Sequence, residues 1–203
     1  MKHARWIFMN VLFLSTVTQA QLTKGIWLAG GSGSFKSYTQ KYNYQNPSFP
    51  TRGTAKYTNI DLNATIGYFV ADNLALGITP TFLSYQGTTF EGVEIINGPR
   101  FAIGPFGRYY LLNKEKPFNI LTEIIYQLGM NFSSSSIEKR RGNFNSFSLK
   151  AGPEIFFNST IGLEVLLGYR TTTITIENTE NPFSNFDSGF EMSVGFQIHL
   201  EKL

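Results

Sequence analysis

The sequence predicts an all-β protein, an eight-stranded antiparallel up-and-down transmembrane β-barrel, and three observations carry this prediction. Apolar and polar residues alternate through most of the chain, and no sustained helical periodicity interrupts them. Short connections alternate with long polar ones along the chain. Charged residues make up only 15% of the sequence, whereas a typical soluble domain has about 25%. Together these features indicate a closed sheet whose apolar face meets lipid.

The N-terminus predicts a signal peptide over residues 1–20, which leaves residues 21–203 as one outer-membrane barrel domain. Two basic residues precede an apolar stretch over residues 6–14, and small and polar residues follow it. This pattern predicts cleavage between Ala20 and Gln21. The apolar stretch is much shorter than the roughly 20 residues that a membrane-spanning helix needs. A buried N-terminal helix is the alternative interpretation.

The composition argues against most catalytic and metal chemistry. The chain has no cysteine and only two histidines, one of them within the predicted signal peptide. Beyond that peptide, fifteen Lys and Arg face fourteen Asp and Glu, so the mature charge is about +1 and nothing indicates a nucleic-acid partner. We therefore predict no catalytic residue, no cofactor and no metal site.

Each predicted strand has one apolar and one polar row, because successive side chains of a strand point to opposite faces. In the strand near 56–70, the apolar row is expected to face lipid and the polar row to face the lumen. The apolar row is Ile60, Leu62, Ile66 and Tyr68, and the polar row is Asn59, Asp61, Asn63 and Thr65. The eight strands are expected near 24–36, 56–70, 74–86, 99–112, 118–132, 146–157, 161–176 and 188–200. In the first strand, either Ile26 and Leu28 or Trp27 and Ala29 could face lipid.

Two hairpins can be registered from the sequence, because apolar residues then meet apolar residues across the turn. The expected pairs are Val70 with Leu74, Tyr68 with Leu76, Ile66 with Ile78, Phe157 with Ile161, and Ile155 with Leu163. Pro80, Pro105 and Pro153 fall inside predicted strands, where proline removes a ladder donor. We therefore expect a local β-bulge at each of them.

The two ends of the predicted barrel differ. Short turns are expected near 71–73, 113–117 and 158–160, and long polar loops near 37–55, 87–98, 133–145 and 177–187. Short periplasmic turns with longer extracellular loops are typical of outer-membrane barrels. Aromatic residues gather near the short-turn end and are expected to form an interfacial girdle. These are Tyr68, Phe69, Tyr109, Tyr110, Phe118, Phe156 and Phe157.

Three segments resemble a known family. "TIGYFVADNLALGI", "IGPFGRYYLL" and the last strand, "GFEMSVGFQIHL", are similar to the small outer-membrane β-barrels of Bacteroidota. That family is related in fold to the OmpA transmembrane domain and to OmpX. The resemblance covers essentially the whole mature chain and rests on architectural motifs. It therefore implies a fold and a location rather than an activity.

Charged residues on the predicted lumen face could form an ion-pair network. The hairpin registers place Arg108 opposite Glu123, and Glu154 opposite Glu164. Two close carboxylates can support acid–base chemistry, but charges in a narrow lumen more often neutralise one another. We expect the second, structural role for Arg108, Glu123, Lys150, Glu154, Glu164, Arg170 and Glu191. His199 is expected to be a hydrogen-bonding residue of the lumen.

The sequence thus predicts a non-enzymatic, Sec-exported, monomeric protein of the bacterial outer membrane. It would contact outer-membrane lipids and display four long extracellular loops that serve adhesion or bind an extracellular ligand. Two alternatives are an outer-membrane lipid-modifying enzyme and a soluble, lipocalin-like periplasmic carrier. An axial channel is not expected, because the interior of an eight-stranded barrel is filled by side chains.

Overall fold

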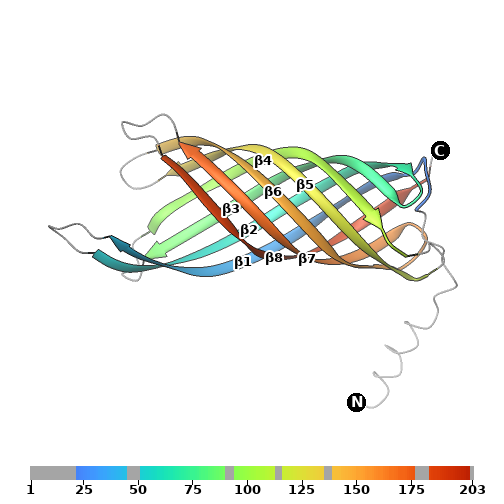
Figure 1. Ribbon diagram of the computed structural model, residues 1–203, viewed down its shortest axis with the longest axis horizontal. Coiled ribbons are helices and arrows are strands. Elements are labelled where there is room, and N and C mark those ends of the chain that lie inside the picture. The colour runs from blue at the N-terminus through green and yellow to red at the C-terminus, as the bar shows by residue number, and fades with distance from the viewer. Residues whose placement is uncertain are drawn as a thin grey trace, which may run out of the picture.

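Eight antiparallel strands close into a barrel, as the sequence predicts (Figure 1). The computed structural model describes residues 22–44, 51–89, 94–112, 116–134, 139–176 and 183–201. Consecutive strands pair with each other and the last pairs with the first, so the up-and-down topology is confirmed. Among these described residues, no helix is long and apolar enough to cross a membrane. The strands are β1 (Trp27–Tyr44), β2 (Thr51–Ala71), β3 (Leu74–Thr89), β4 (Glu94–Tyr110), β5 (Phe118–Ser134), β6 (Lys139–Phe156), β7 (Ile161–Ile176) and β8 (Phe183–Leu200).

The strand register sets the tilt of the barrel. A path that starts at Trp27 and steps from each residue to its partner on the next strand reaches Phe190 on β8. The β1–β8 register, continued upward, places Phe190 opposite Ser37. The path thus returns to β1 ten residues from its start, and this offset is the shear of the barrel. With strands about 4.8 Å apart and about 3.3 Å per residue, this shear gives a tilt of about 40°. A barrel of this size leaves an interior just wide enough for side chains.

Large apolar side chains cover the outer surface, and polar side chains fill the inside. On β2, Leu62 is 55% exposed, whereas its neighbours Asp61 and Asn63 are 7% and 8% exposed. Leu167 on β7 is 64% exposed, while Glu164 on the same strand is 1% exposed. A soluble protein places its apolar side chains inside, so this arrangement requires lipid around the barrel and argues against the lipocalin-like alternative.

The apolar outer band has the height of a membrane. On β5 it runs from Phe118 to Met130, which are 43% and 49% exposed. At a tilt of about 40° and about 3.3 Å per residue, this stretch rises about 30 Å, close to the thickness of a bilayer hydrocarbon core. On β1, Leu28 is fully buried and Trp27 is half exposed, so Trp27 rather than Leu28 faces lipid.

The hairpin at Asp72 is tighter than expected. Asn73 has a φ of 64°, in the left-handed region that Asn tolerates better than most residues, and a bulge between Phe69 and Ala71 shifts the register next to the turn. The predicted Val70–Leu74 pair is therefore wrong, since Ala71 pairs with Leu74. The pairs confirmed farther from the turns are Tyr68–Leu76, Ile66–Ile78 and Ile155–Leu163, and Phe157 N donates to Ile161 O at 2.9 Å.

The predicted long loops are wrong in extent. The expected loop over 37–55 contains the ends of β1 and β2, which remain paired as far as Tyr44 and Thr51. The other three expected loops, near 87–98, 133–145 and 177–187, likewise contain strand ends. These stretches are polar, but polar composition does not exclude a strand, because antiparallel backbone pairing can continue in water beyond the lipid band. The connecting residues 45–50, 90–93, 135–138 and 177–182 lie outside the described residues.

The expected bulges at the three prolines are also wrong. On both sides of Pro105 the β4–β5 register is the same: Ile103 pairs with Leu128 and Phe106 with Ile125. The same holds for the β2–β3 ladder at Pro80 and the β6–β7 ladder at Pro153. At each proline, two consecutive residue pairs are missing from the ladder, but the strand contains no extra residue. The missing N–H of proline therefore leaves a local gap in the backbone hydrogen bonds and does not shift the register.

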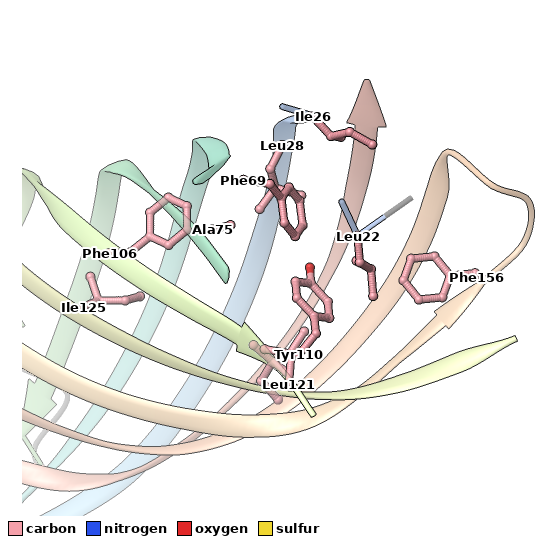
Figure 2. Close-up of a cluster of buried hydrophobic side chains, with 11 residues drawn as sticks. Leu22, Ile26, Leu28, Phe69, Ala75, Phe106, Tyr110, Leu121, Ile125 and Phe156 are labelled. Carbon is pink, nitrogen blue, oxygen red and sulfur yellow. The ribbon is translucent and has the colours of Figure 1, made fainter. Parts of the chain in front are cut away.

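A hydrophobic cap closes the lumen at the short-turn end (Figure 2). The N-terminal segment Leu22–Ile26 lies across this end, where Asn73 N donates to Leu22 O at 2.8 Å and Gly25 N donates to Phe69 O at 2.9 Å. The predicted girdle is therefore partly wrong, because Phe69, Tyr110 and Phe156 are buried inside, while Tyr109, Phe118 and Phe157 face outward. The cap residues are Leu22, Ile26, Leu28, Phe69, Ala75, Phe106, Tyr110, Leu121, Ile125, Phe156 and Leu166.

Candidate functional site

The charged side chains of the lumen form the candidate functional site. All seven residues singled out from the sequence lie on inward positions of their strands, and the structure joins them into two clusters with one further carboxylate and the histidine. We call the cluster beside the hydrophobic cap the lower cluster and the one nearer the loops the upper cluster. The lower cluster is Arg108, Glu123, Glu154, Glu164 and His199, and the upper cluster is Asp61, Lys150, Arg170 and Glu191.

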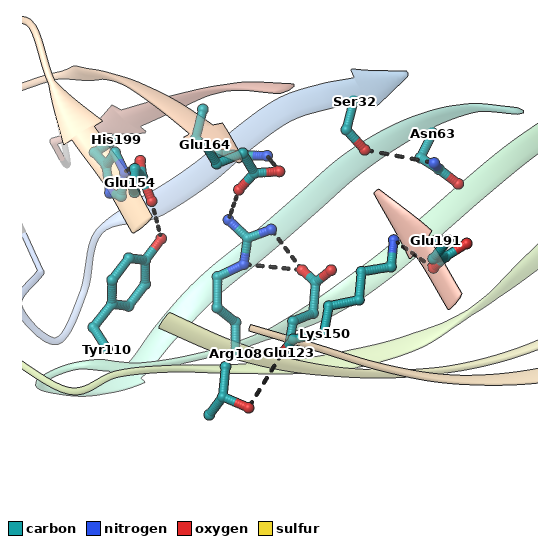
Figure 3. Close-up of polar contacts among 12 residues, drawn as sticks. Ser32, Asn63, Arg108, Tyr110, Glu123, Lys150, Glu154, Glu164, Glu191 and His199 are labelled. Atoms are coloured by element: carbon teal, nitrogen blue, oxygen red, sulfur yellow. Dashed lines mark hydrogen bonds and ion pairs between the residues drawn. The ribbon is translucent and has the colours of Figure 1, made fainter. Parts of the chain in front are cut away.

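Arg108 is the centre of the lower cluster (Figure 3). It is 1% exposed; its Nε donates to Glu123 Oε2 at 2.9 Å, and its Nη1 lies 2.8 Å from Glu164 Oε2. The predicted pairing of Arg108 with Glu123 across β4 and β5 is thus present as a side-chain contact. Gln197 on β8 donates to the other oxygen of Glu164 at 3.1 Å. One cation therefore holds two carboxylates that come from different strands.

Glu154 binds a different set of partners. It pairs with Glu164 in the β6–β7 ladder, as expected, but the two carboxylates turn apart. Tyr110 OH donates to Glu154 Oε2 at 2.9 Å, and His199 Nε2 lies 2.9 Å from Glu154 Oε1. The His199 ring is fully buried among the rings of Phe69, Tyr110 and Phe156. The lower cluster therefore ends directly under the hydrophobic cap.

The upper cluster crosses the barrel. Lys150 Nζ lies 3.3 Å from Glu191 Oε1, and Arg170 Nη2 lies 2.9 Å from Glu191 Oε2. Arg170 Nη1 also lies 2.7 Å from Asp61 Oδ2. The side chains of Arg170 and Asp61 are 13% and 10% exposed, so this cluster keeps some contact with solvent, unlike Arg108.

Small residues make room for these side chains. A Cβ atom added to Gly162 would lie 2.1 Å from Glu154 Oε1, and one added to Gly168 would lie 2.6 Å from Lys150 Cγ. Each glycine stands on β7 beside the bulky β6 residue that crosses it. These two glycines thus leave room for long charged side chains inside the lumen.

Sequence reasoning missed several members of the site. The sequence places Asp61 in the lumen but gives no reason to include it in the network, and it places Tyr110 in the girdle. A polar relay farther up, in which Gln127 donates to Thr81 at 2.6 Å and Thr81 donates to Asn63 at 2.7 Å, was not foreseen. Only the polar row itself could have pointed to these residues, because their contacts depend on which strands face each other across the closed barrel.

The side chains of the two clusters contact one another through ion pairs and hydrogen bonds. Glu154 and His199 are fully buried beneath the cap, Tyr110 is fully buried within it, and Glu164 is only 1% exposed. Acid–base chemistry needs the acting group within hydrogen-bond reach of a substrate atom, and these groups are buried in this structure. Within the described part of the chain, no group of three His, Asp or Glu residues is arranged to hold a metal ion.

Solved structures with the same architecture come from outer membranes. No family model matches the chain, and no curated protein matches it in sequence. It is similar to the outer membrane protein OprG of Pseudomonas aeruginosa, with a TM-score of 0.55 and 12% identity over 91% of this chain and 100% of that one. The chain has the fold of the small outer-membrane barrels.

Two further structures support the same fold. The N-terminal β-barrel domain of Pseudomonas aeruginosa OprF has a TM-score of 0.51 at 10% identity, over 87% of this chain and 98% of that one. Neisserial surface protein A has a TM-score of 0.51 at 13% identity, over 86% and 97%. The predicted family resemblance is therefore confirmed at the level of the fold, whereas its Bacteroidota detail stays a prediction.

Proposed function

We propose that this chain is a non-enzymatic integral protein of the bacterial outer membrane, exported by the Sec pathway with cleavage between Ala20 and Gln21. Its barrel acts as a closed scaffold, and the four hairpins at the end opposite the cap meet an adhesion partner or an extracellular ligand. The signal peptide lies outside the described residues. The neighbours in fold support the membrane location, since all three are outer-membrane or surface barrels.

One observation carries the scaffold role: the lumen is filled with ion-paired side chains. From Arg108 at 1% to Arg170 at 13%, the paired charged side chains have little exposed surface. A transport channel needs a continuous water-filled pathway through the barrel, and a catalytic site needs a route by which substrate can reach it. A lumen that is capped at one end and crossed by charges favours neither. The parts of the protein left to contact a partner are the strand ends beyond the lipid band.

The hairpins support display as the function. β1 and β2 remain paired about ten residues beyond Ser34, the last β1 residue that pairs with β8. At about 2.5 Å of height per residue for a tilted strand, this hairpin would stand about 25 Å above that point. Such a paired projection would present a surface to the outside without requiring the barrel to move.

The test combines membrane fractionation with surface labelling. Washed outer membranes should contain a protein whose mobility in SDS shifts on boiling, because a closed barrel resists SDS until heated. The chain has no cysteine, so Thr51→Cys and Asp72→Cys each introduce a single thiol, at the hairpin end and the short-turn end. On intact cells, a bulky maleimide should label Thr51→Cys and leave Asp72→Cys unlabelled.

Two results would reject the proposal, and a third would reject its orientation. Recovery in the soluble periplasm without a heat shift would exclude the membrane scaffold. A change in lipid A mass that depends on this protein and disappears in Glu154→Gln, while the heat shift remains, would instead establish the lipid-modifying enzyme. Equal labelling of both cysteines would contradict the proposed orientation.

A further inference from the structure

The backbone pairing that closes the barrel ends part-way up. β1 and β8 pair from Trp27 with Leu200 to Ser34 with Ser193. Above this point β1 continues to Tyr44 paired with β2, and β8 begins at Phe183 paired with β7. Among the described residues, the two edges are not paired with each other there. In Figure 1 the far ends of β1 and β8 run to different corners of the barrel. We call this part of the β1–β8 boundary the open seam.

The open seam begins within the lipid band. Ser34 lies about 17 Å above Trp27 along the barrel axis, whereas the apolar band is about 25–30 Å high. Phe190 and Met192 on β8 flank the open seam, and both face outward. Phe190 is 82% exposed, compared with 43% for its ladder partner Tyr169, and the backbone of Phe190 has no β1 partner. Unpaired backbone groups are costly in hydrocarbon, so another interaction must hold these edges together.

Arg170 crosses the open seam from the inside. It stands on β7 beside Gly189 of β8, which has no side chain to block its path. Its guanidinium reaches Asp61 on β2 at 2.7 Å, and Asp61 stands beside Ser34 at the start of the open seam. The same guanidinium lies 2.9 Å from Glu191 on β8. One side chain thus links the β1–β2 hairpin to the β7–β8 hairpin where the backbone ladder stops.

We propose that Asp61, Arg170 and Glu191 form a latch that holds the unpaired edges of β1 and β8 together at the open seam, and that release of this latch gives the upper lumen lateral access to the outer leaflet. The guanidinium of Arg170 is held through its two Nη atoms, one on Asp61 and one on Glu191. Lys150 Nζ lies 3.3 Å from the other oxygen of Glu191, and this contact would keep Glu191 in place after release of Arg170.

The latch differs from the lower cluster in what it joins. Arg108 links Glu123 on β5 to Glu164 on β7, which lie in a part of the barrel where every strand is paired on both sides. Loss of that link removes stability without opening an edge. Arg170 alone among the lumen cations of these two clusters joins strands on opposite sides of the β1–β8 boundary.

The test measures the width of the open seam. Spin labels at Ser37 of β1 and Ser188 of β8 lie above the last backbone pair, and the cysteine-free chain allows both to be introduced as single cysteines. In lipid vesicles, Arg170→Met should move the distance distribution between the labels outward by about 5 Å or more, the spacing of neighbouring strands, and should broaden it. Asp61→Asn, a milder change, should shift it in the same direction by less.

Two controls make the result decisive. Labels at Ala29 and Ile198, which are paired below the open seam, should keep their distance in every variant. Arg141→Met removes a cation that contacts Phe132 on the outer surface and should leave both distances unchanged. Only heat-modifiable, folded protein is measured. The proposal is overturned if Arg170→Met leaves the upper distance unchanged, or if the lower distance widens as much as the upper one.

Discussion

The lower and upper halves of this barrel hold their strands together in different ways. In the lower half every strand is paired on both sides, the charges are almost fully buried, and a hydrophobic cap seals the end. In the upper half β1 and β8 part, and the charges keep some solvent contact. The comparison teaches that backbone pairing can join the strands where the ladder is complete, and that side-chain ion pairs can join them where the ladder ends.

The largest expected difference between the halves is the response to losing a cation. Arg108→Met leaves Glu123 and Glu164 buried without a partner charge, and should lower the free energy of unfolding by about 3–5 kcal/mol. Arg170→Met should cost clearly less, because its side chain is 13% exposed rather than 1%. Urea unfolding in vesicles can be followed by the fluorescence of Trp27, the only tryptophan beyond the predicted signal peptide. An equal or greater loss for Arg170→Met would break the comparison.

A second contrast uses two glycines of the same strand. A Cβ at Gly30 would lie 2.4 Å from the backbone oxygen of Phe196, so Gly30→Ala must push β1 and β8 apart and should cost about 2–3 kcal/mol. At Gly33, close to the open seam, the nearest atom would be 3.8 Å away. Gly33→Ala should therefore stay within about 0.5 kcal/mol of the parent in the same unfolding measurement. Similar losses for both variants would show that crowding does not differ between the two positions.

A third, smaller effect tests the hydrogen bond under the cap. Tyr110→Phe keeps the ring in the cap but removes the donor to Glu154, and should lower the free energy of unfolding by about 1.5 kcal/mol. Tyr109→Phe is the matched control, because Tyr109 faces outward and is 46% exposed. It should have almost no effect. If both variants behave alike, the buried hydroxyl contributes nothing specific.

The smallest expected effect is local and needs no mutation. Backbone amides of β8 from Phe183 to Met192 lack a β1 partner on one side, so about every second amide there should exchange with solvent faster than those from Ser193 to Leu200. Hydrogen exchange followed by NMR in detergent micelles measures this residue by residue. Uniform protection along β8 would mean that the open seam is closed in solution.

Part of the candidate site followed from the sequence because hairpin registers are local. Arg108 opposite Glu123 and Glu154 opposite Glu164 needed only the turn position and the match of apolar rows. The contact between Asp61 and Arg170 could not be predicted in this way, since 109 residues separate them and they meet only when the barrel closes. The contact between Glu154 and His199 could not be predicted from the sequence either, because the direction of the Glu154 side chain depends on the space left by Gly162.

The sequence by itself determined the strand pattern, the face of most strands that meets lipid, and the number and order of strands. A period of two needs no knowledge of distant residues, and a one-residue slip would expose every polar side chain to lipid. Only the tertiary structure decided the direction of Phe69, Tyr110 and Phe156, the lengths of the hairpins, and the place where β1 and β8 part. These features depend on shear, tilt and closure, which are properties of the whole ring of strands rather than of any one of them.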